Sequence, residues 1–279
     1  MLAEKRNYGK WSIAVFFVTV IVLSAVVEFK ICTGGDGWLY MLLMWIPAVA
    51  SIFANIVYFI ENKERFSIKK FFNYGGFKLC KIRYVLMGVL LPFVYIMIPY
   101  MLYWFIYPDN FAYNGVNILL ILRDLLPVIV IGILINLISA SGEEIGWRGC
   151  MVPMLYEKVG LKKSLIISSL FWCLWHLPLL IFGDYMAGTP LWYQLIAFVL
   201  CIFPVGIMCG LLCLKSGSMF PAAFVHAVHN NLDQAVFGLI TRGENMMYFV
   251  SETGIFTIIA AWIVAALLYL CFKKADTNS

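Results

Sequence analysis

Long runs of apolar residues, separated by short polar segments, dominate this sequence. A helix that crosses a bilayer needs about 20 mostly apolar residues, and eight runs approach or exceed that length. We expect membrane-spanning helices at residues 11–28, 38–60, 84–107, 118–141, 164–183, 190–214, 219–240 and 250–272. The pattern therefore predicts an all-α, polytopic membrane protein with about eight transmembrane helices.

The polar segment 61–83 is too charged to cross a bilayer. Within it, Phe71 and Phe72 follow Lys69 and Lys70 directly. Apolar residues interleaved with basic ones are typical of a short amphipathic helix on the membrane surface. An irregular basic loop is the alternative.

Composition supports a chain solvated mainly by lipid. Of the 279 residues, 63% are hydrophobic and 13% are charged, whereas a soluble domain has about a quarter of its residues charged. The mean hydropathy is +0.91. Because no linker, repeat or low-complexity tract divides the chain, we expect one integral membrane domain, residues 1–279.

The net charge of +5 is distributed as in a membrane protein. Sixteen of the 20 Lys and Arg residues lie in the two terminal tails and in the loops 61–83, 149–163 and 215–218. In the eight-helix arrangement these segments share one side of the membrane, and Lys and Arg mark the cytoplasmic side. We therefore expect a multi-pass protein of the cell membrane with both termini in the cytoplasm, and no nucleic-acid partner.

Ionisable residues inside apolar runs are costly and mark functional sites. The first such cluster contains Glu143, Glu144 and Arg148. Glu144 and Arg148 are four residues apart and can pair on one face of a helix, which leaves Glu143 available for another role. Gly146 and Gly149 in the same stretch would let neighbouring helices approach closely.

Two further clusters contain all three histidines of the chain. His176 lies deep in an apolar run, and Pro178 should bend or end the helix just beyond it. The run that begins near residue 219 holds two pairs spaced four apart, His226 with Asn230 and His229 with Asp233. Spacing alone does not decide which pair is functional.

The three clusters, in this order, resemble the motifs of the CAAX protease and bacteriocin-processing family of intramembrane endopeptidases, also called the Abi family. The resemblance covers roughly residues 120–240, the expected catalytic core. The matching residues are Glu143, Glu144 and Arg148, then Trp172 and His176, then His226 and Asn230. The family usually has Phe where this sequence has Trp172. The context of Pro221 and Ala227 favours His226 and Asn230 over the second pair.

The resemblance implies an intramembrane cavity in which Glu143 and His176 activate a water molecule. His226 and Asn230 would then stabilise the oxyanion of the tetrahedral intermediate. Donors held in a low-dielectric cavity stabilise such a charge strongly.

The remaining motif residues complete the expected site. Glu144 belongs to the catalytic set, with Arg148 and Trp172 in supporting roles. Glu143, His176 and His226 could also bind zinc, since two histidines and one carboxylate with a bound water form a common hydrolytic zinc site. We expect a metal-free enzyme without cofactor, and zinc is the alternative.

The expected activity is hydrolysis of a peptide bond in a membrane-associated or lipidated protein or peptide. This activity would serve CAAX-type processing, bacteriocin maturation or self-immunity, with membrane lipid as the surrounding partner. The alternatives are a polytopic transporter, with the polar residues lining a substrate path, and a non-catalytic bacteriocin-immunity protein. No sequence feature indicates an oligomeric state.

Overall fold

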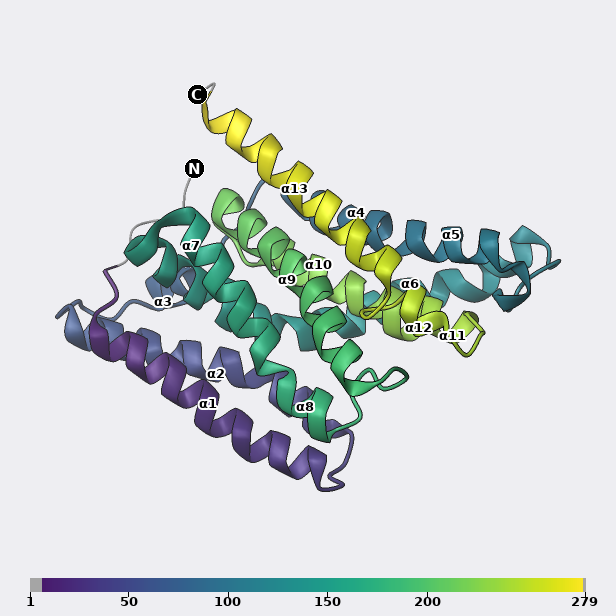
Figure 1. Ribbon diagram of the computed structural model, residues 1–279. Coiled ribbons are helices and arrows are strands. Elements are labelled where there is room, and N and C mark those ends of the chain that lie inside the picture. Colours follow the sequence, from purple (N-terminus) through teal and green to yellow (C-terminus); the bar gives the residue numbers. More distant parts are fainter. Residues whose placement is uncertain (1–6, 278–279) are drawn as a thin grey trace.

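The computed structural model describes residues 7–277, and its elements in that range are helices (Figure 1). The α-helices are α1 (Lys10–Cys32), α2 (Trp38–Glu61), α3 (Ile68–Tyr74), α4 (Ile82–Pro92), α5 (Ile98–Ile106), α6 (Ile118–Glu144), α7 (Val152–Trp175), α8 (Leu177–Phe182), α9 (Leu191–Ser216), α10 (Phe220–Asn230), α11 (Gly238–Ile240), α12 (Met246–Phe249) and α13 (Ile255–Thr277). The π-helical segments are η1 (Phe93–Met97), η3 (Ile145–Met151) and η4 (Asn231–Phe237), and η2 (Pro108–Asn110) is a 3-10 turn. The all-α fold class is confirmed.

Six helical segments between Lys10 and Lys274 are long and apolar enough to cross a membrane. One of them, Ile118–Phe182, has 65 residues and includes two of the predicted spans. The predicted span 219–240 is helical but is not among the six. Its polar side chains lower its hydropathy, and α10 is mostly buried among other helices instead of facing lipid.

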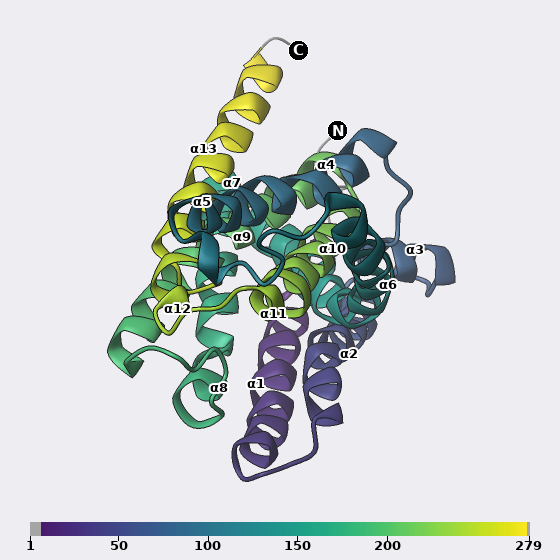
Figure 2. The same cartoon turned by 90° about the vertical axis from the view of Figure 1, so that its right-hand side faces the viewer.

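The bundle is built around α10. It packs against α4, α6 and α9, while α9 also contacts α7 and α13. An antiparallel hairpin of α1 and α2 packs on α6 and lies beside this group, as Figures 1 and 2 show. The start of α1, the end of α9 and the end of α13 lie toward the left in Figure 1. The assignment of that side to the cytoplasm stays a prediction.

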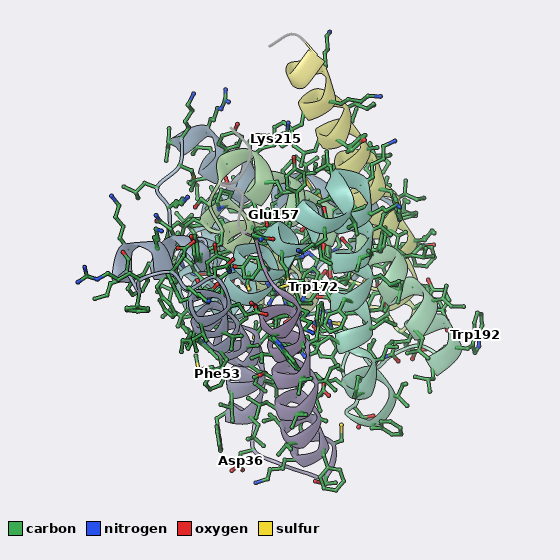
Figure 3. The ribbon with its side chains drawn as sticks, turned by 90° about the vertical axis from the view of Figure 1, so that its left-hand side faces the viewer. Asp36, Phe53, Glu157, Trp172, Trp192 and Lys215 are labelled. Atoms are coloured by element: carbon green, nitrogen blue, oxygen red, sulfur yellow. The ribbon has the colours of Figure 1, made fainter. Side chains whose placement is uncertain are left out.

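The outer surface of the bundle is apolar. Leu134 and Ile138 on α6 are more than half exposed, and α1 and α13 also present large apolar side chains outward (Figure 3). An exposed apolar band of this extent would be unfavourable in water and is suited to lipid. The structure therefore agrees with a multi-pass membrane protein.

The basic segment 61–83 does contain a short helix, α3. Ser67 caps its N-terminus by accepting a hydrogen bond from the Lys70 backbone N–H. Lys69 and Phe72 are both exposed on this helix, as an interfacial helix requires. Of the two alternatives for this segment, the helix is correct.

Candidate active site

The first motif lies where α6 passes into the π-helical segment η3. Glu143 and Glu144 occupy the last turn of α6, and Arg148 lies within η3. A Cβ on Gly146 would clash with Pro47 of α2, and one on Gly149 would clash with the backbone of Gly75. The glycines therefore allow the close approach that the sequence predicted, and they bring the two glutamates into the interior.

Glu144 is fully buried and forms the predicted ion pair with Arg148. Its Oε1 accepts hydrogen bonds from Arg148 at 2.8 Å and from the Nδ1 of His226 at 2.9 Å. Its Oε2 is buried without a hydrogen-bond partner among residues 7–277. Glu144 thus connects η3 to α10 and does not line the cavity described below.

Glu143 has one occupied and one available carboxylate oxygen. Oε2 accepts hydrogen bonds from the indole N–H groups of Trp147, at 3.1 Å, and Trp172, at 2.7 Å. Oε1 has no hydrogen-bond partner in the described part of the chain. The two indoles hold the carboxylate in one orientation, which leaves Oε1 available to a substrate or a water molecule.

His176 lies at the junction between α7 and α8, where Pro178 ends the regular helix as predicted. Its Nδ1 lies 2.8 Å from the backbone oxygen of Trp172. Because a carbonyl oxygen can only accept, this nitrogen carries the proton. In the neutral ring, Nε2 is therefore the nitrogen with the free lone pair.

Trp172 contacts four other side chains of the motif set: Glu143, Arg148, His176 and His226. Besides its bond to Glu143, its ring lies 4.2 Å from the Arg148 guanidinium carbon. The rings of His176 and His226 meet it edge to face, with centroids 5.7 and 5.3 Å away. The supporting role expected for Trp172 thus has a structural basis in packing as well as in hydrogen bonding.

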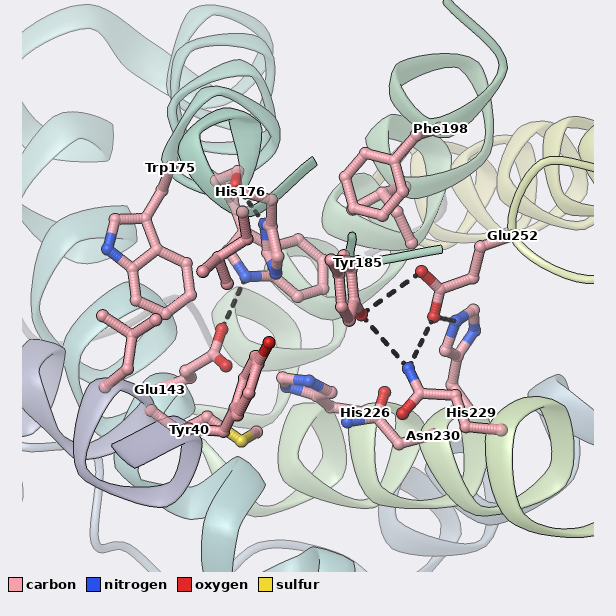
Figure 4. Close-up of a pocket in the computed structure, with 16 residues that line it drawn as sticks. Tyr40, Glu143, Trp175, His176, Tyr185, Phe198, His226, His229, Asn230 and Glu252 are labelled. Atoms are coloured by element: carbon pink, nitrogen blue, oxygen red, sulfur yellow. Dashed lines mark hydrogen bonds and ion pairs between the residues drawn. The ribbon is translucent and has the colours of Figure 1, made fainter. Parts of the chain in front are cut away.

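One cavity of about 220 Å³ collects the motif side chains (Figure 4). It is lined by Glu143 from α6, Trp172 from α7, His176, and His226 and Asn230 from α10. The structure therefore brings residues from three clusters, far apart in sequence, to one space. Their chemical roles stay predictions.

The second histidine pair of α10 and η4 has different partners. His229 lines the cavity but bonds to Tyr95 and Glu252. Asp233 bonds to Tyr100 and Ser251 and does not line the cavity. His229 thus connects α10 to other segments, and Asp233 does the same for η4. The Asn230 side chain, in contrast, lines the cavity and has no hydrogen-bond partner within residues 7–277.

Sequence reasoning missed several polar residues that line the cavity, among them Tyr185, Gln234 and Glu252. Tyr185 and Glu252 lie in loops, after α8 and before α13 respectively, and Gln234 lies in η4. A polar residue in a loop or beside other polar residues gives no signal in the sequence that it lines a cavity. Glu252 is 1% exposed, and this burial is visible only in the structure.

The arrangement of Glu143, His176 and His226 can be compared with what a zinc site requires. A protonated Nδ1 on both His176 and His226 would leave each Nε2 free for a metal, as is usual for histidine ligands. However, in the part of the chain that the structure describes, no three His, Cys, Asp or Glu side chains lie close enough to hold one ion. In the described arrangement the three candidates do not form a ligand set.

Comparison with known proteins agrees with the resemblance seen in the motifs. The family model for type II CAAX prenyl endopeptidase Rce1-like proteins matches residues 125–232, the range that holds all three motifs. The chain is also 27% identical over 285 aligned positions to CAAX prenyl protease 2 of Methanococcus maripaludis, and the alignment covers 97% of each chain. The resemblance seen in the motifs is confirmed: the chain is similar to CAAX proteases across the range that holds the motifs and along most of its length.

Proposed function

We propose that this protein is an intramembrane endopeptidase that hydrolyses a peptide bond in a prenylated, membrane-associated protein or peptide. The observation that carries the proposal is the geometry of Glu143. Its carboxylate is buried at a cavity, with Oε2 held by two indole donors and Oε1 without a hydrogen-bond partner among the described residues. A fixed carboxylate oxygen beside a small polar cavity is suited to bind and deprotonate water.

In the proposed reaction, Glu143 Oε1 takes a proton from water as the water oxygen attacks the carbonyl carbon. His176 lines the same cavity with its Nε2 lone pair available. It would accept a hydrogen bond from the water or take up its proton. The proton then moves to the leaving nitrogen as the C–N bond breaks, which releases a carboxylate and an amine.

His226 and Asn230 would stabilise the oxyanion of the tetrahedral intermediate. They line the same cavity one helical turn apart on α10. The Asn230 amide, which has no partner among the described residues, would donate to the developing oxyanion. His226 would donate through Nε2, and this requires a doubly protonated ring, because Nδ1 already donates to Glu144.

The charges around His226 favour that doubly protonated form. Glu144 accepts from the His226 ring and from Arg148 through the same oxygen. A carboxylate bonded to the ring stabilises its imidazolium form. We therefore assign Glu144 to positioning and charge balance at His226, and Arg148 to holding Glu144.

The substrate class is inferred from the family and from the cavity lining. Type II CAAX prenyl endopeptidases, as their name states, act on prenylated proteins. Leu43, Leu179 and Ile202 supply apolar lining beside the polar residues here. An apolar lining accommodates a lipid-bearing substrate, and the expected product is a prenylcysteine with a free carboxylate.

The test is cleavage of a farnesylated peptide ending in a CAAX sequence by the full chain in liposomes. Mass spectrometry should show a new terminus at the farnesylcysteine with the wild type and none with Glu143→Gln. Glu244→Gln, a change at an exposed glutamate, is the control and should cleave normally. No cleavage by the wild type would overturn the proposal, and vesicle uptake of the intact peptide would support transport. Equal cleavage of the unfarnesylated peptide would exclude the prenyl requirement.

A further inference from the structure

The side of the cavity opposite Glu143 is built from two loops far apart in sequence. Tyr185 lies in the loop between α8 and α9, and Glu252 lies in the loop between α12 and α13. Both side chains line the cavity and lie beside each other in Figure 4. Neither has a role in the hydrolysis described above.

The Glu252 carboxylate holds the hydroxyl group of Tyr185. Its Oε2 accepts from that hydroxyl at 3.5 Å, and its Oε1 accepts from the Gln234 amide at 3.0 Å. The same Gln234 nitrogen also donates to the Tyr185 hydroxyl at 3.2 Å. A buried carboxylate is stable only with such partners, so the loop of Tyr185 is tied to η4 and to Glu252.

Glu252 is itself held from the helix bundle. The Nε2 of His229 lies 3.1 Å from Glu252 Oε1, and its Nδ1 lies 3.0 Å from the hydroxyl of Tyr95. Since a carboxylate accepts, Nε2 carries a proton, and in the neutral ring Nδ1 accepts from Tyr95. Glu252 therefore has a fixed position relative to α10 and η1.

The ring of Tyr185 packs directly on His176. The two rings are nearly parallel, at 25°, with centroids 6.1 Å apart, and Phe198 contacts the His176 ring at 5.3 Å. The Tyr185 backbone oxygen accepts a hydrogen bond from the side chain of Gln194 on α9. A shift of Tyr185 would remove one of the surfaces that orient His176.

The backbone is strained beside both residues. Asp184 and Met186, on either side of Tyr185, have φ of 53° and 56°, and Ser251, just before Glu252, has φ of 70°. Among the described residues, one other non-glycine position, Lys63, has a positive φ. Such conformations are unfavourable and persist where the surroundings hold them, often at functional sites.

We propose that Glu252 is a positioning residue that acts through Tyr185 on His176. The carboxylate holds the Tyr185 hydroxyl, and with it the 183–190 segment, against the cavity. The Tyr185 ring then keeps His176 in the orientation that makes Nε2 available. This inference rests on the proposed peptidase function, and it requires no contact between Glu252 and substrate.

The kinetic test compares Tyr185→Phe, Glu252→Gln and the double variant on the farnesylated peptide. Each single change should lower kcat about 10- to 150-fold, the range expected for one lost hydrogen bond to a charged group. KM should stay within about twofold, because substrate contacts are unchanged. The double variant should be no more than about twofold slower than the slower single variant, since both act through one contact.

The control is Tyr58→Phe. Tyr58 also donates its hydroxyl to a loop glutamate, Glu64, at 3.1 Å, but it does not line the cavity. Its kcat should equal that of the wild type. A Tyr185→Phe variant with wild-type kcat would overturn the proposal. So would a double variant whose fold-loss in kcat equals the product of the two single fold-losses. If Glu252→Gln does not fold, Tyr185→Phe alone decides.

Hydrogen exchange separates this proposal from the proposed function. Amide exchange in residues 183–190 should be faster in Tyr185→Phe and Glu252→Gln, and unchanged in Tyr58→Phe and Glu143→Gln. This measurement needs no substrate, so it reports on the contact even if the wild type cleaves no peptide. Unchanged exchange in both loop variants would show that Glu252 does not hold the segment.

Discussion

The Nδ1 nitrogen of His226 lies 2.9 Å from Oε1 of Glu144, although 82 residues separate them in sequence. Arg148 bonds to the same oxygen at 2.8 Å. This buried arrangement joins η3 to α10 and keeps Glu144 out of the cavity that Glu143 lines. The two adjacent glutamates thus have different structural roles, and the predictions below depend on that difference.

Arg148→Ala should destabilise the fold. The variant removes the Arg148 guanidinium from the Glu144 carboxylate, which is 0% exposed, and breaking a buried pair costs about 3–5 kcal/mol. The yield of folded protein and the unfolding temperature in detergent should both fall. Replacing both residues, as Glu144→Gln with Arg148→Gln, should lower the unfolding temperature less. An Arg148→Ala variant that accumulates normally and loses only turnover would contradict this.

His226→Ala and Asn230→Ala should each lower turnover about 10²- to 10³-fold, the effect of removing one oxyanion donor. The control is Asp233→Asn in η4, which directly follows α10. The Asp233 side chain lies outside the cavity and bonds to Tyr100 and Ser251. The turnover of this variant per folded molecule should stay within about threefold of the wild type. The assay is peptide cleavage normalised to folded protein. A large loss of turnover in Asp233→Asn together with normal turnover in His226→Ala and Asn230→Ala would show that the wrong pair was assigned.

Trp172→Phe should retain activity within about tenfold, because the ring contacts remain and Trp147 still donates to Glu143 Oε2. The double change Trp147→Phe with Trp172→Phe removes both indole donors from that oxygen. An unsatisfied buried acceptor costs about 1–3 kcal/mol, so turnover should fall well below that of either single variant. Equal turnover of the double and single variants would show that the indoles do not hold Glu143.

Gly146→Ala should lower the free energy of unfolding by about 1–3 kcal/mol, the usual cost of overpacking. Its added Cβ would clash with Pro47. Gly37→Ala is the control, because a Cβ there meets no atom within 4 Å and the backbone has φ of −58°. Thermal unfolding in detergent measures both, and equal unfolding temperatures would contradict the close packing of η3 on α2.

Removal of metal should leave cleavage unchanged. The proposed water activation uses Glu143 and His176 and includes no metal-bound step. Protein dialysed against a chelator should be compared with untreated protein, with zinc content measured by elemental analysis. Loss of activity on dialysis and its return with one equivalent of zinc would establish the zinc alternative, with Glu143, His176 and His226 as the residues to examine.

The helical, membrane-type architecture and many of the cavity-lining residues follow from the sequence alone. Apolar runs long enough to cross a bilayer predict helices because backbone polar groups in lipid must bond within the segment. The pairing of Glu144 with Arg148 follows from a spacing of four on a helix, and Pro178 ends the helix at His176 because it lacks an N–H donor. These features depend on neighbours within one or two turns.

Which side chains meet in the cavity depends on the tertiary packing. It assigned one Glu143 oxygen to two indoles, directed His229 and Asp233 to other partners, and placed Glu252 beside Tyr185. Apart from the bond between Trp147 and Glu143, which are four residues apart, these contacts join segments that local spacing does not relate. A glutamate in a polar loop also costs nothing until the fold buries it. The physical reason is that burial and hydrogen-bond partners are properties of the packed chain, not of the residues along it.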